Sequence, residues 1–320
     1  MRAEYYLGID TSNYTTSAAI VDGDGRVIAN CKCPLPVAEG ACGLRQSDAV
    51  FSHIKNLPVL MQTVRPYLQG GDLVAIGVSE APRRAEGSYM PCFLSGVAAA
   101  EAASAATGVP LYRFSHQCGH LAAALLSSER EDLFATPFAA FHVSGGTTEL
   151  VHVKGFSNDG FSVELLGGTA DLNAGQVIDR VGVMLGLRFP CGPALETLAE
   201  DAVRVPRPRI SVKGYRANLS GVENQAQKML RDGVEPSVIA AYVLDFVAET
   251  LAALSSELRN SCGELPIVYA GGVMCNKRIR ARLSAFGDTA FAEPSFSADN
   301  AAGIALLCKK RHGGSYADRI

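Results

Sequence analysis

The same short pattern occurs twice in this chain, about 135 residues apart, and it limits the possible folds more than any other feature. Each copy reads as an apolar strand, a turn of small polar residues and a second apolar strand; residues 5–21 form the first copy and residues 139–153 the second. Each copy then runs through an Asp-Gly turn, the strongest short signal for a β-hairpin, into a third strand. Because this repeat of a three-stranded meander is too long for a solenoid, we expect two duplicated domains that face each other.

The turn of the second copy is Ser144-Gly145-Gly146-Thr147-Thr148. Glycine allows the backbone to turn sharply or to approach a ligand closely, and successive free N–H groups form a concavity that suits phosphate. Taken alone, this stretch is explained equally well by an ordinary hairpin. The corresponding small polar turn in the first copy, from Asp10 to Thr16, favours a phosphate-binding turn in each domain.

Composition narrows the class of protein. A chain of 320 residues with 48% apolar residues is long enough for two domains with full cores. The net charge of −3 excludes binding of nucleic acid by general attraction, so RNA would need a local patch or a partner. We expect no signal peptide and no membrane span, because no uninterrupted apolar run reaches about 18 residues. Nine scattered cysteines indicate a reduced, cytoplasmic protein.

A pair of histidines, His116 and His120, stands at the start of a predicted helix. Residues four apart share one helix face, so their side chains can bind one divalent metal ion. The zinc-protease motif needs a glutamate after the first histidine, and Gln117 stands there, which makes a metallopeptidase unfavourable. A pair at this spacing is structural more often than metal-binding unless a third ligand exists. Asp299, at the start of the last predicted helix, is the best candidate for it.

Two other stretches suggest ligands, and each is weak alone. Gly271-Gly272 follows a buried strand at 267–270 and precedes a helix, which is an arrangement found at nucleotide sites. Residues 204–216, here called the basic segment, carry five cations and no acid, and their prolines argue against a helix. A solvated loop and an RNA-facing surface explain the basic segment equally well. We expect helices at residues 44–68, 93–107, 173–187, 238–258, 276–283 and 301–308.

Taken together, six motifs in order resemble the family of tRNA N(6)-threonylcarbamoyladenosine synthases, once misnamed O-sialoglycoprotein endopeptidases. LGIDTS resembles the family's first turn, HQCGH its metal-binding HxxGH, and VSGGTTELV its SGGHT strand-turn-strand. Asp171, Ala174 and Gly175 match part of its DDAAGE segment. GGVMCN resembles GGVAAN, and SADNAAGIAL resembles TDNAAMIA. The resemblance covers almost the whole chain.

The resemblance implies an α/β protein with the duplicated actin-like, sugar-kinase-like ATPase fold, in which two domains face a nucleotide cleft. We expect residues 1–136 plus 297–320 in one domain and residues 137–296 in the other. The family transfers a threonylcarbamoyl group from threonylcarbamoyl-AMP to the adenosine beside the anticodon of tRNA. It acts with partner proteins, among them an ATPase and a metal-less paralogue.

The resemblance also implies the site residues. One divalent metal ion, iron or zinc, is expected on His116, His120 and Asp299. The phosphates of an adenine nucleotide are expected at the stretch from His142 through Val143, Ser144 and Gly145 to Gly146. The ribose and base are expected at Asp179, Gly192 and Asn276.

Several positions depart from the family pattern. Asn13-Tyr14-Thr15 replaces Cys-Asp-Glu, Thr147 replaces the histidine of SGGH, and Leu172 and Gln176 replace two acids of DDAAGE. No residue is therefore assigned as catalytic. A metal-assisted transferase and a non-catalytic, nucleotide-binding paralogue both remain open. A phosphotransferase of the same fold would have only Asp10 as its base.

Overall fold

The computed structural model describes residues 2–12, 14–36, 44–293 and 300–314. The chain divides into two compact units: the first comprises residues 1–131, 156–162 and 298–320, and the second comprises residues 132–155 and 163–297. Each unit has its own β-sheet and its own hydrophobic core. The domain boundaries expected from the sequence stay a prediction.

In the first unit, the described strands form a five-stranded sheet in the order β3-β2-β1-β4-β5. Neighbouring strands of the meander β1–β2–β3 are antiparallel, whereas β4 is parallel to β1 and β5 is parallel to β4. The meander predicted for this copy is therefore confirmed. The strands are β1 (Ala3–Ser12), β2 (Thr15–Asp22), β3 (Val27–Pro34), β4 (Gly71–Ala81) and β5 (Leu111–Ser115).

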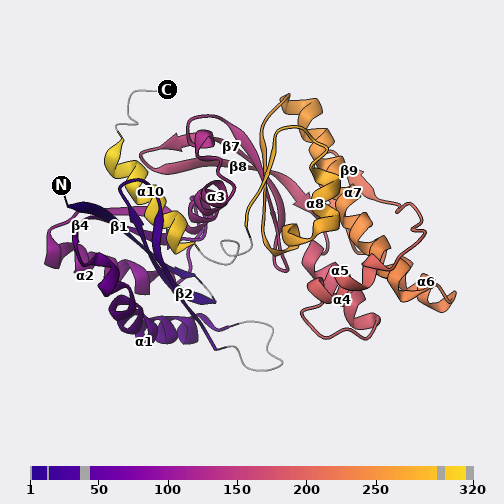
Figure 1. The fold of residues 1–320 in the computed structure, drawn as a ribbon, viewed down its shortest axis with the longest axis horizontal. Coiled ribbons are helices and arrows are strands. Elements are labelled where there is room, and N and C mark those ends of the chain that lie inside the picture. The colour runs from indigo at the N-terminus through magenta and orange to yellow at the C-terminus, as the bar shows by residue number, and fades with distance from the viewer. Residues whose placement is uncertain (1, 13, 37–43, 294–299, 315–320) are drawn as a thin grey trace. The chain divides into compact units, whose positions relative to one another are not determined.

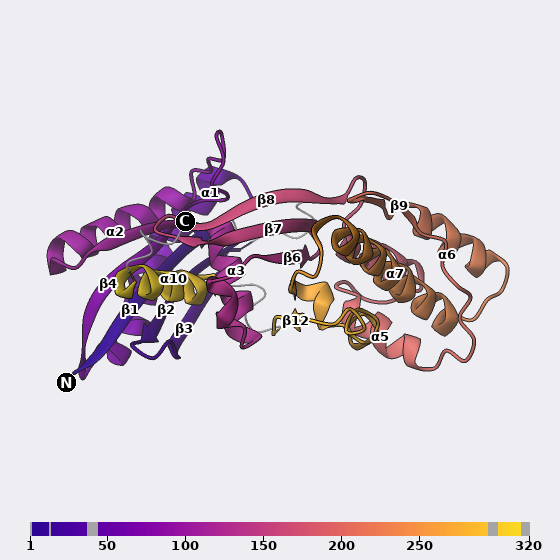
Figure 2. The ribbon, with the colours of Figure 1, turned by 90° about the horizontal axis from the view of Figure 1, so that it is seen from above.

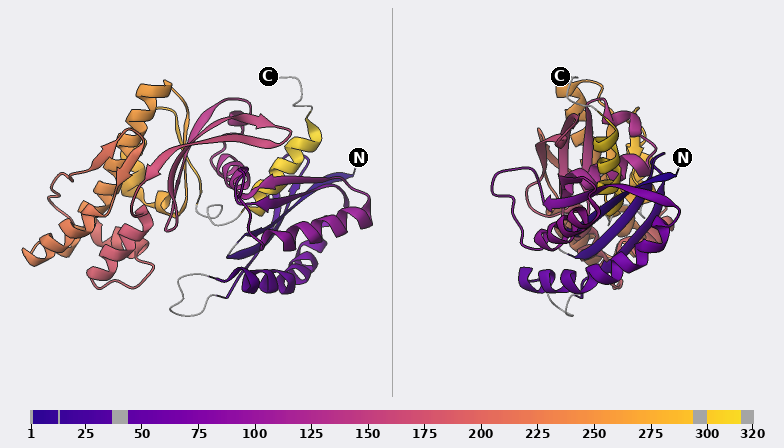
Figure 3. Two further views of the ribbon diagram at one scale, coloured as in Figure 1. Left: turned by 180° about the vertical axis from the view of Figure 1, so that it is seen from behind. Right: turned by 90° about the vertical axis from the view of Figure 1, so that its left-hand side faces the viewer.

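Different helices cover the two faces of this sheet, because successive residues of a strand point to opposite faces. Leu7 and Ile9 of β1 lie in the core with residues of α1 (Gln46–Val64) and α2 (Phe93–Thr107). Gly8 points the other way, and a Cβ there would lie 2.2 Å from the carbonyl oxygen of Ala301 in α10 (Ala301–Gly313). Only glycine allows this approach. Figure 1 and Figure 3 show α1 and α2 on one side of the sheet and α10 on the other.

The second unit repeats this sheet. Its described strands follow the order β12-β11-β6-β7-β8-β10-β9, so β8-β7-β6-β11-β12 corresponds to the order in the first unit. β6 is antiparallel to β7 and parallel to β11, and β11 is parallel to β12. Figure 2 shows β6, β7 and β8 side by side. The strands are β6 (Phe138–Val143), β7 (Thr148–Ser157), β8 (Gly160–Thr169), β9 (Ser211–Lys213), β10 (Arg216–Asn218), β11 (Ile267–Ala270) and β12 (Thr289–Phe291).

The core of the second unit is built around helix α7 (Pro236–Cys262), which packs with strands β6, β7 and β11. By length and composition α7 is long and apolar enough to cross a membrane, but it is mostly buried in this core. The core also takes residues from the other helices of the unit. These are α4 (Ala174–Met184), α5 (Gly192–Glu200), α6 (Gly221–Arg231) and α8 (Lys277–Leu283).

The helix bounds differ from the expected ones where proline or glycine acts on the backbone. α1 ends at Val64, and a 3-10 helix with Pro66 in its first turn (Arg65–Leu68) follows it. α4 ends at Met184 instead of 187, because Gly186 adopts a left-handed φ of 83°. The remaining described elements are α3 (His116–Ser127) and 3-10 helices at Glu131–Phe134 and Gly272–Cys275.

Two parts of the second unit were not predicted from the sequence. Helix α5 begins at Gly192 and was not expected there, although Pro193 in its first turn is a recognisable start signal. The basic segment is only partly a loop, since residues 211–213 and 216–218 pair as the antiparallel strands β9 and β10.

Candidate functional site

The turn between β6 and β7 in the second unit is ordered by Ser144. The backbone N–H of Ser144 donates to the carbonyl oxygen of Thr147 over 2.7 Å. The side-chain oxygen of Ser144 accepts from the N–H groups of Gly146 and Thr147 at 3.3 and 3.1 Å. A Cβ on Gly145 or Gly146 would meet nothing within 4 Å, so both glycines border open space. The N–H groups of Ser144, Gly146 and Thr147 are therefore used inside the turn, unlike the free N–H groups expected from the sequence, and the two glycines leave room for a ligand.

The N-terminus of α4 lies against this turn. The N–H of Gly175 donates to the carbonyl oxygen of Ser144 over 3.1 Å, and a Cβ on Gly175 would lie 2.7 Å from the backbone of Gly145. The N–H of Ala174 donates to the side-chain oxygen of Thr148 over 2.9 Å. A helix N-terminus carries partial positive charge, so the turn and α4 together form a favourable place for an anion.

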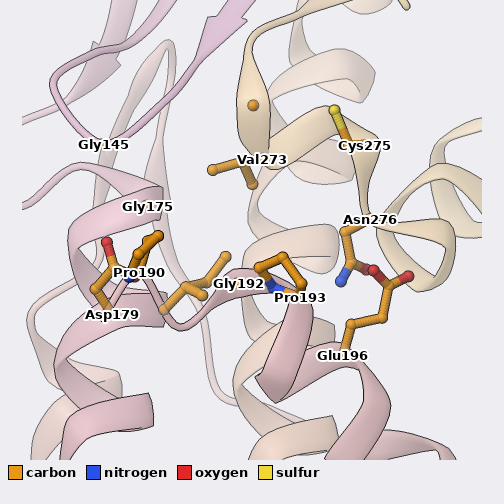
Figure 4. Close-up of a pocket in the computed structure, with 12 residues that line it drawn as sticks. Gly145, Gly175, Asp179, Pro190, Gly192, Pro193, Glu196, Val273, Cys275 and Asn276 are labelled. Carbon is orange, nitrogen blue, oxygen red and sulfur yellow. The ribbon is translucent and has the colours of Figure 1, made fainter. Parts of the chain in front are cut away.

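A pocket of about 210 Å³ opens beside the turn, entirely within the second unit. Four of the residues expected to bind the nucleotide line it, namely Gly145, Asp179, Gly192 and Asn276. They come from the turn, from α4, from the start of α5 and from the residue before α8, as Figure 4 shows. The other lining residues are Gly175, Ile178, Pro190, Pro193, Glu196, Gly272, Val273 and Cys275.

The polar groups at this pocket are held by the helix ends. One oxygen of Asp179 accepts the N–H of Cys191 over 2.8 Å, which ties α4 to the start of α5. The side-chain oxygen of Asn276 accepts the N–H of Ile279 over 3.0 Å and caps α8. This cap fixes the orientation of the amide, so the Nδ2 group of Asn276 remains to donate to a ligand.

Glu196 is the lining residue with the clearest polar role that the sequence did not suggest. It lies on the unpredicted helix α5, and its carboxylate accepts the N–H of Lys277 over 2.6 Å at the start of α8. Figure 4 shows Glu196 next to Asn276 at one end of the pocket. Recognition of the Gly-Pro start of α5 would have placed Glu196 one helical turn after Gly192.

The rest of the predicted phosphate stretch is not among the residues that line this pocket. His142 and Val143 belong to β6, and Val143 is fully buried. Its carbonyl oxygen would lie 2.3 Å from a Cβ on Gly271, so the strand end packs tightly against the glycine pair. Ser144 and Gly146 lie in the turn next to Gly145. These residues hold or border the pocket, and their contact with phosphate stays a prediction.

In the first unit, the predicted histidine pair lies at the start of α3. The ring centroids of His116 and His120 are 4.6 Å apart. Nδ1 of His116 is 3.0 Å from a carboxylate oxygen of Asp10, which lies near the end of β1. Asn300 also reaches His116, because its side-chain nitrogen donates to the carbonyl oxygen of His116 over 3.1 Å. The same nitrogen lies 2.6 Å from Nδ1 and 3.1 Å from Nε2 of the imidazole, so a metal ion on Nε2 would have to displace the amide of Asn300. Residues far apart in the sequence therefore meet at this pair.

Asp10 is buried, with 2% of its surface exposed. Burial alone would raise the pKa of its carboxyl group. The charge of His116 and the hydrogen bonds from His116, Ser79 and Ser12 outweigh burial, so the pKa of Asp10 is lowered. A carboxylate on the rear nitrogen of a histidine is the usual partner of a metal-binding imidazole.

The histidine pair fits two positions of a metal site, since two imidazoles one helical turn apart can ligate one ion. Asp299, the expected third ligand, lies outside the described residues, although its neighbour Asn300 touches His116. Over the part of the chain that the structure describes, no group of three or more His, Cys, Asp or Glu side chains is arranged to hold a metal ion.

Two of the substituted family positions, Leu172 and Gln176, have structural roles here. The side chain of Gln176 accepts the N–H of Asn173 over 3.0 Å in a capping box at the start of α4. Leu172 is half-buried and packs against the core of the second unit. The retained Asp171 accepts the N–H groups of Leu219 and Ser220 at 2.8 and 3.0 Å, just before α6. The segment around α4 therefore keeps its shape without the two replaced acids.

Comparison with known proteins gives matches over almost the whole chain. Residues 47–306 match the family described as TsaD, tRNA N6-adenosine threonylcarbamoyltransferase. The protein of that name from Thermus thermophilus is 31% identical over 319 residues, which cover 98% of this chain and 93% of that protein. A namesake from Pelobacter propionicus is 29% identical over 318 residues, covering 94% of this chain and 90% of that protein.

Solved structures with low sequence identity share the fold. Full-length HypF in its phosphate- and nucleotide-bound form gives a TM-score of 0.63 at 13% identity, covering 98% of this chain and 56% of that chain. Component A of the (R)-2-hydroxyglutaryl-CoA dehydratase from Acidaminococcus fermentans gives a TM-score of 0.57 at 15% identity. The match covers 97% of this chain and 99% of that chain. The predicted actin-like ATPase fold with two α/β domains is thus confirmed.

Proposed function

The chain belongs to the tRNA N6-adenosine threonylcarbamoyltransferase family, and we propose that it transfers a threonylcarbamoyl group from threonylcarbamoyl-AMP to the adenosine beside the anticodon of tRNA. In this reaction the N6 amine of adenosine forms a bond to the carbamoyl carbon and loses a proton. The bond from that carbon to the phosphate oxygen breaks, and AMP leaves.

The observation that carries the proposal is the composition of one pocket. Gly145, Asp179, Gly192 and Asn276 are far apart in the sequence, and the family resemblance assigns each of them to the nucleotide. All four line the same cavity in the second unit. We therefore assign this cavity to the adenylate half of the substrate.

Within the pocket, each group has a role that suits its chemistry. The open space at Gly145 and the N-terminus of α4 suit the phosphate. The carboxylate of Asp179 suits a ribose hydroxyl, and the Nδ2 group of Asn276 suits a ring nitrogen of adenine. Ile178 and Val273 supply an apolar wall for the base. The positive end of the α4 dipole near the phosphate would stabilise the charge that develops on AMP as it leaves.

The first unit carries the expected metal ligands. A divalent ion, iron or zinc, would be held by His116, His120 and Asp299 and would polarise the carbamoyl or phosphate oxygens. Asp10 orients His116 through its hydrogen bond to Nδ1. Paralogous and ATPase partner proteins are part of the proposal, as in the family.

A specific observation favours a second candidate, a nucleotide-binding paralogue without activity. Leu172 and Gln176 stand where the family pattern has acids. Leu172 packs against the core, and Gln176 caps α4. On that reading the pocket binds the nucleotide, and the chain acts as a scaffold for an active synthase.

A transfer assay separates the two candidates. The purified chain is incubated with threonylcarbamoyl-AMP and unmodified tRNA, with and without partner proteins, and the tRNA nucleosides are analysed by mass spectrometry. The proposal predicts threonylcarbamoyladenosine in the tRNA. AMP binding without any modified nucleoside, even with partners present, would contradict the transferase and support the scaffold.

A further inference from the structure

The basic segment forms a surface of exposed positive charge on the second unit. Its five cations are all exposed. Within the described residues, none of the five takes part in a salt bridge or a side-chain hydrogen bond, although the chain as a whole carries a net charge of −3. The cations are Arg204, Arg207, Arg209, Lys213 and Arg216.

Two of these cations lie directly opposite each other. Lys213 of β9 pairs with Arg216 of β10 across a tight antiparallel hairpin. Like charges at such a position destabilise a hairpin. An anion bound between them would remove this repulsion, and no carboxylate within the described residues forms an ion pair with either side chain.

The hairpin is held firmly although its cations face solvent. β10 pairs in parallel with β8, and Ala217 is fully buried in the core. The N–H of Gly168 donates to the carbonyl oxygen of Tyr215 over 2.8 Å. Asp171 fixes the chain just after β10 through Leu219 and Ser220. The cations are thus presented on a rigid support at the edge of the sheet, where Figure 1 shows β9 beside α7.

Two acids of α7 lie near this surface: Glu257 acts on Tyr215 of the hairpin, and Glu249 already has a cationic partner. Glu249 of α7 forms a two-pronged ion pair with Arg282, with nitrogen–oxygen distances of 2.6 and 3.2 Å. Arg207 adds to the positive field around Glu249 and helps lower the pKa of its carboxyl group. Of the five cations, Arg207 is therefore the least available to a ligand, and Arg209, Lys213 and Arg216 are the most suitable for a test.

We propose that the basic segment binds the phosphate backbone of tRNA and positions it on the second unit. The inference rests on the proposed function for the identity of the RNA. Contacts to phosphates fix the register and orientation of a nucleic acid without reading its sequence. Long cationic side chains on a fixed hairpin are suited to that role, and at a net charge of −3 the binding of RNA needs either a local basic surface of this kind or a partner.

Binding of unmodified tRNA as a function of salt concentration tests the proposal. Each neutralised phosphate contributes roughly 0.7–0.9 to the slope of log affinity against log salt. The variant Arg209→Ala/Lys213→Ala/Arg216→Ala should therefore lower the slope by about 2–3 units and weaken binding about 100-fold at 0.1 M salt. Its AMP affinity and thermal unfolding should match those of the wild type.

Two further variants are matched to this one. Lys55→Ala/Arg65→Ala/Lys154→Ala removes the same charge elsewhere on the surface and should leave the slope within about 0.5 units. Arg209→Lys/Arg216→Lys keeps the charges and should retain the slope, since lysine also binds phosphate.

An unchanged salt slope in the triple alanine variant would overturn the proposal for the basic segment. It would leave the transferase proposal intact, because the transfer assay tests that proposal separately. Equal loss of binding to polyglutamate would assign the surface to an acidic protein and would also overturn it. Absence of salt-dependent tRNA binding by the wild type, alone and with partners, would do the same.

Discussion

The two units use the same strand connection for different chemistry. In the first unit, the buried carboxylate of Asp10, near the end of β1, faces His116 of α3. In the second unit, the corresponding strand β6 ends in the Ser144–Gly146 turn, which has no acid and borders a pocket. A duplicated scaffold therefore carries a carboxylate–histidine cluster in one copy and a candidate anion site in the other.

The difference lies in the side chains at the strand end and in the helix that reaches it. Asp10 is partnered by the start of α3 and by Ser79 of β4. The second turn is met by the N-terminus of α4, where Gly175 allows backbone contact. The sheet order is common to both units, so the fold alone assigns neither role. Substitutions at the two turns should consequently have separable effects.

The largest effect is expected at the histidine pair. We predict that the purified protein holds one divalent ion per chain. His120→Ala should lower metal affinity by more than about 100-fold, because it removes a metal ligand. Loss of a residue that only hydrogen-bonds a ligand typically costs roughly 10–100-fold. Asp10→Asn keeps both imidazoles and should cost only about 10–100-fold. Metal content by mass spectrometry after dialysis measures both. His312→Ala, an exposed histidine of α10, is the control, and full metal retention in His120→Ala would refute the assignment.

The next effect is expected at the turn of the second unit. A Cβ on Gly145 meets no protein atom within 4 Å, so Gly145→Val should fold normally but fill the space for phosphate. Overpacking costs about 1–3 kcal/mol, so AMP affinity should fall roughly 10–100-fold by calorimetry. Gly23→Val, in a hairpin turn of the first unit where a Cβ would only make ordinary van der Waals contact with Glu4, should leave AMP affinity unchanged. Equal AMP affinity in Gly145→Val and the wild type would remove this turn from the site.

A smaller effect is expected at Asp171, the acid that the second unit uses for structure. Burial tends to raise the pKa of Asp171, but hydrogen bonds from Ser220, Leu219 and Leu172 lower it. Because this pKa is lower in the folded state, the carboxylate stabilises the fold at every pH above the unfolded-state pKa of about 3.9. The stabilisation is lost as the pH falls through the folded-state pKa. Asp171→Asn should therefore lower the free energy of unfolding by about 1 kcal/mol near pH 7, a small value because the carboxylate is partly exposed. As the pH falls below about 4, the free energy of unfolding should decrease less in Asp171→Asn than in the wild type.

Denaturant unfolding across pH measures this effect, with Asp201→Asn, an exposed acid of the same unit, as the control. AMP affinity should stay within about twofold, because Asp171 does not line the pocket. A large loss of AMP affinity in Asp171→Asn at unchanged stability would instead place this acid at the ligand.

The smallest effect is expected at Gln176. Glutamate takes the same place in a capping box and interacts favourably with a helix N-terminus, so Gln176→Glu should change stability by less than about 0.5 kcal/mol. Gln176→Ala removes the acceptor for the N–H of Asn173 and should cost roughly 0.5–1 kcal/mol. Thermal unfolding of the three proteins provides the comparison. A clear rise in tRNA modification in Gln176→Glu would show that the replaced acid limits the reaction.

The duplicated meander was readable from the sequence because strand, Asp-Gly turn and strand are local signals. The His116–His120 pair was readable because helical spacing is local too. The contact of Asp10 with His116 was not, since it depends on strand β1 and helix α3 meeting across 106 positions of sequence. Glu196 was missed because α5 was missed, and the hairpin of the basic segment was missed because Pro206 and Pro208 suggested a loop.

The separation of roles between the two units is tested most directly by measuring AMP affinity and single-turnover threonylcarbamoyl transfer in His120→Ala and Gly145→Val side by side. We expect His120→Ala to keep AMP affinity within about threefold while transfer is lost, and Gly145→Val to lose both AMP affinity and transfer. Loss of AMP affinity in His120→Ala as large as in Gly145→Val, or full transfer in either variant, would contradict this separation of roles.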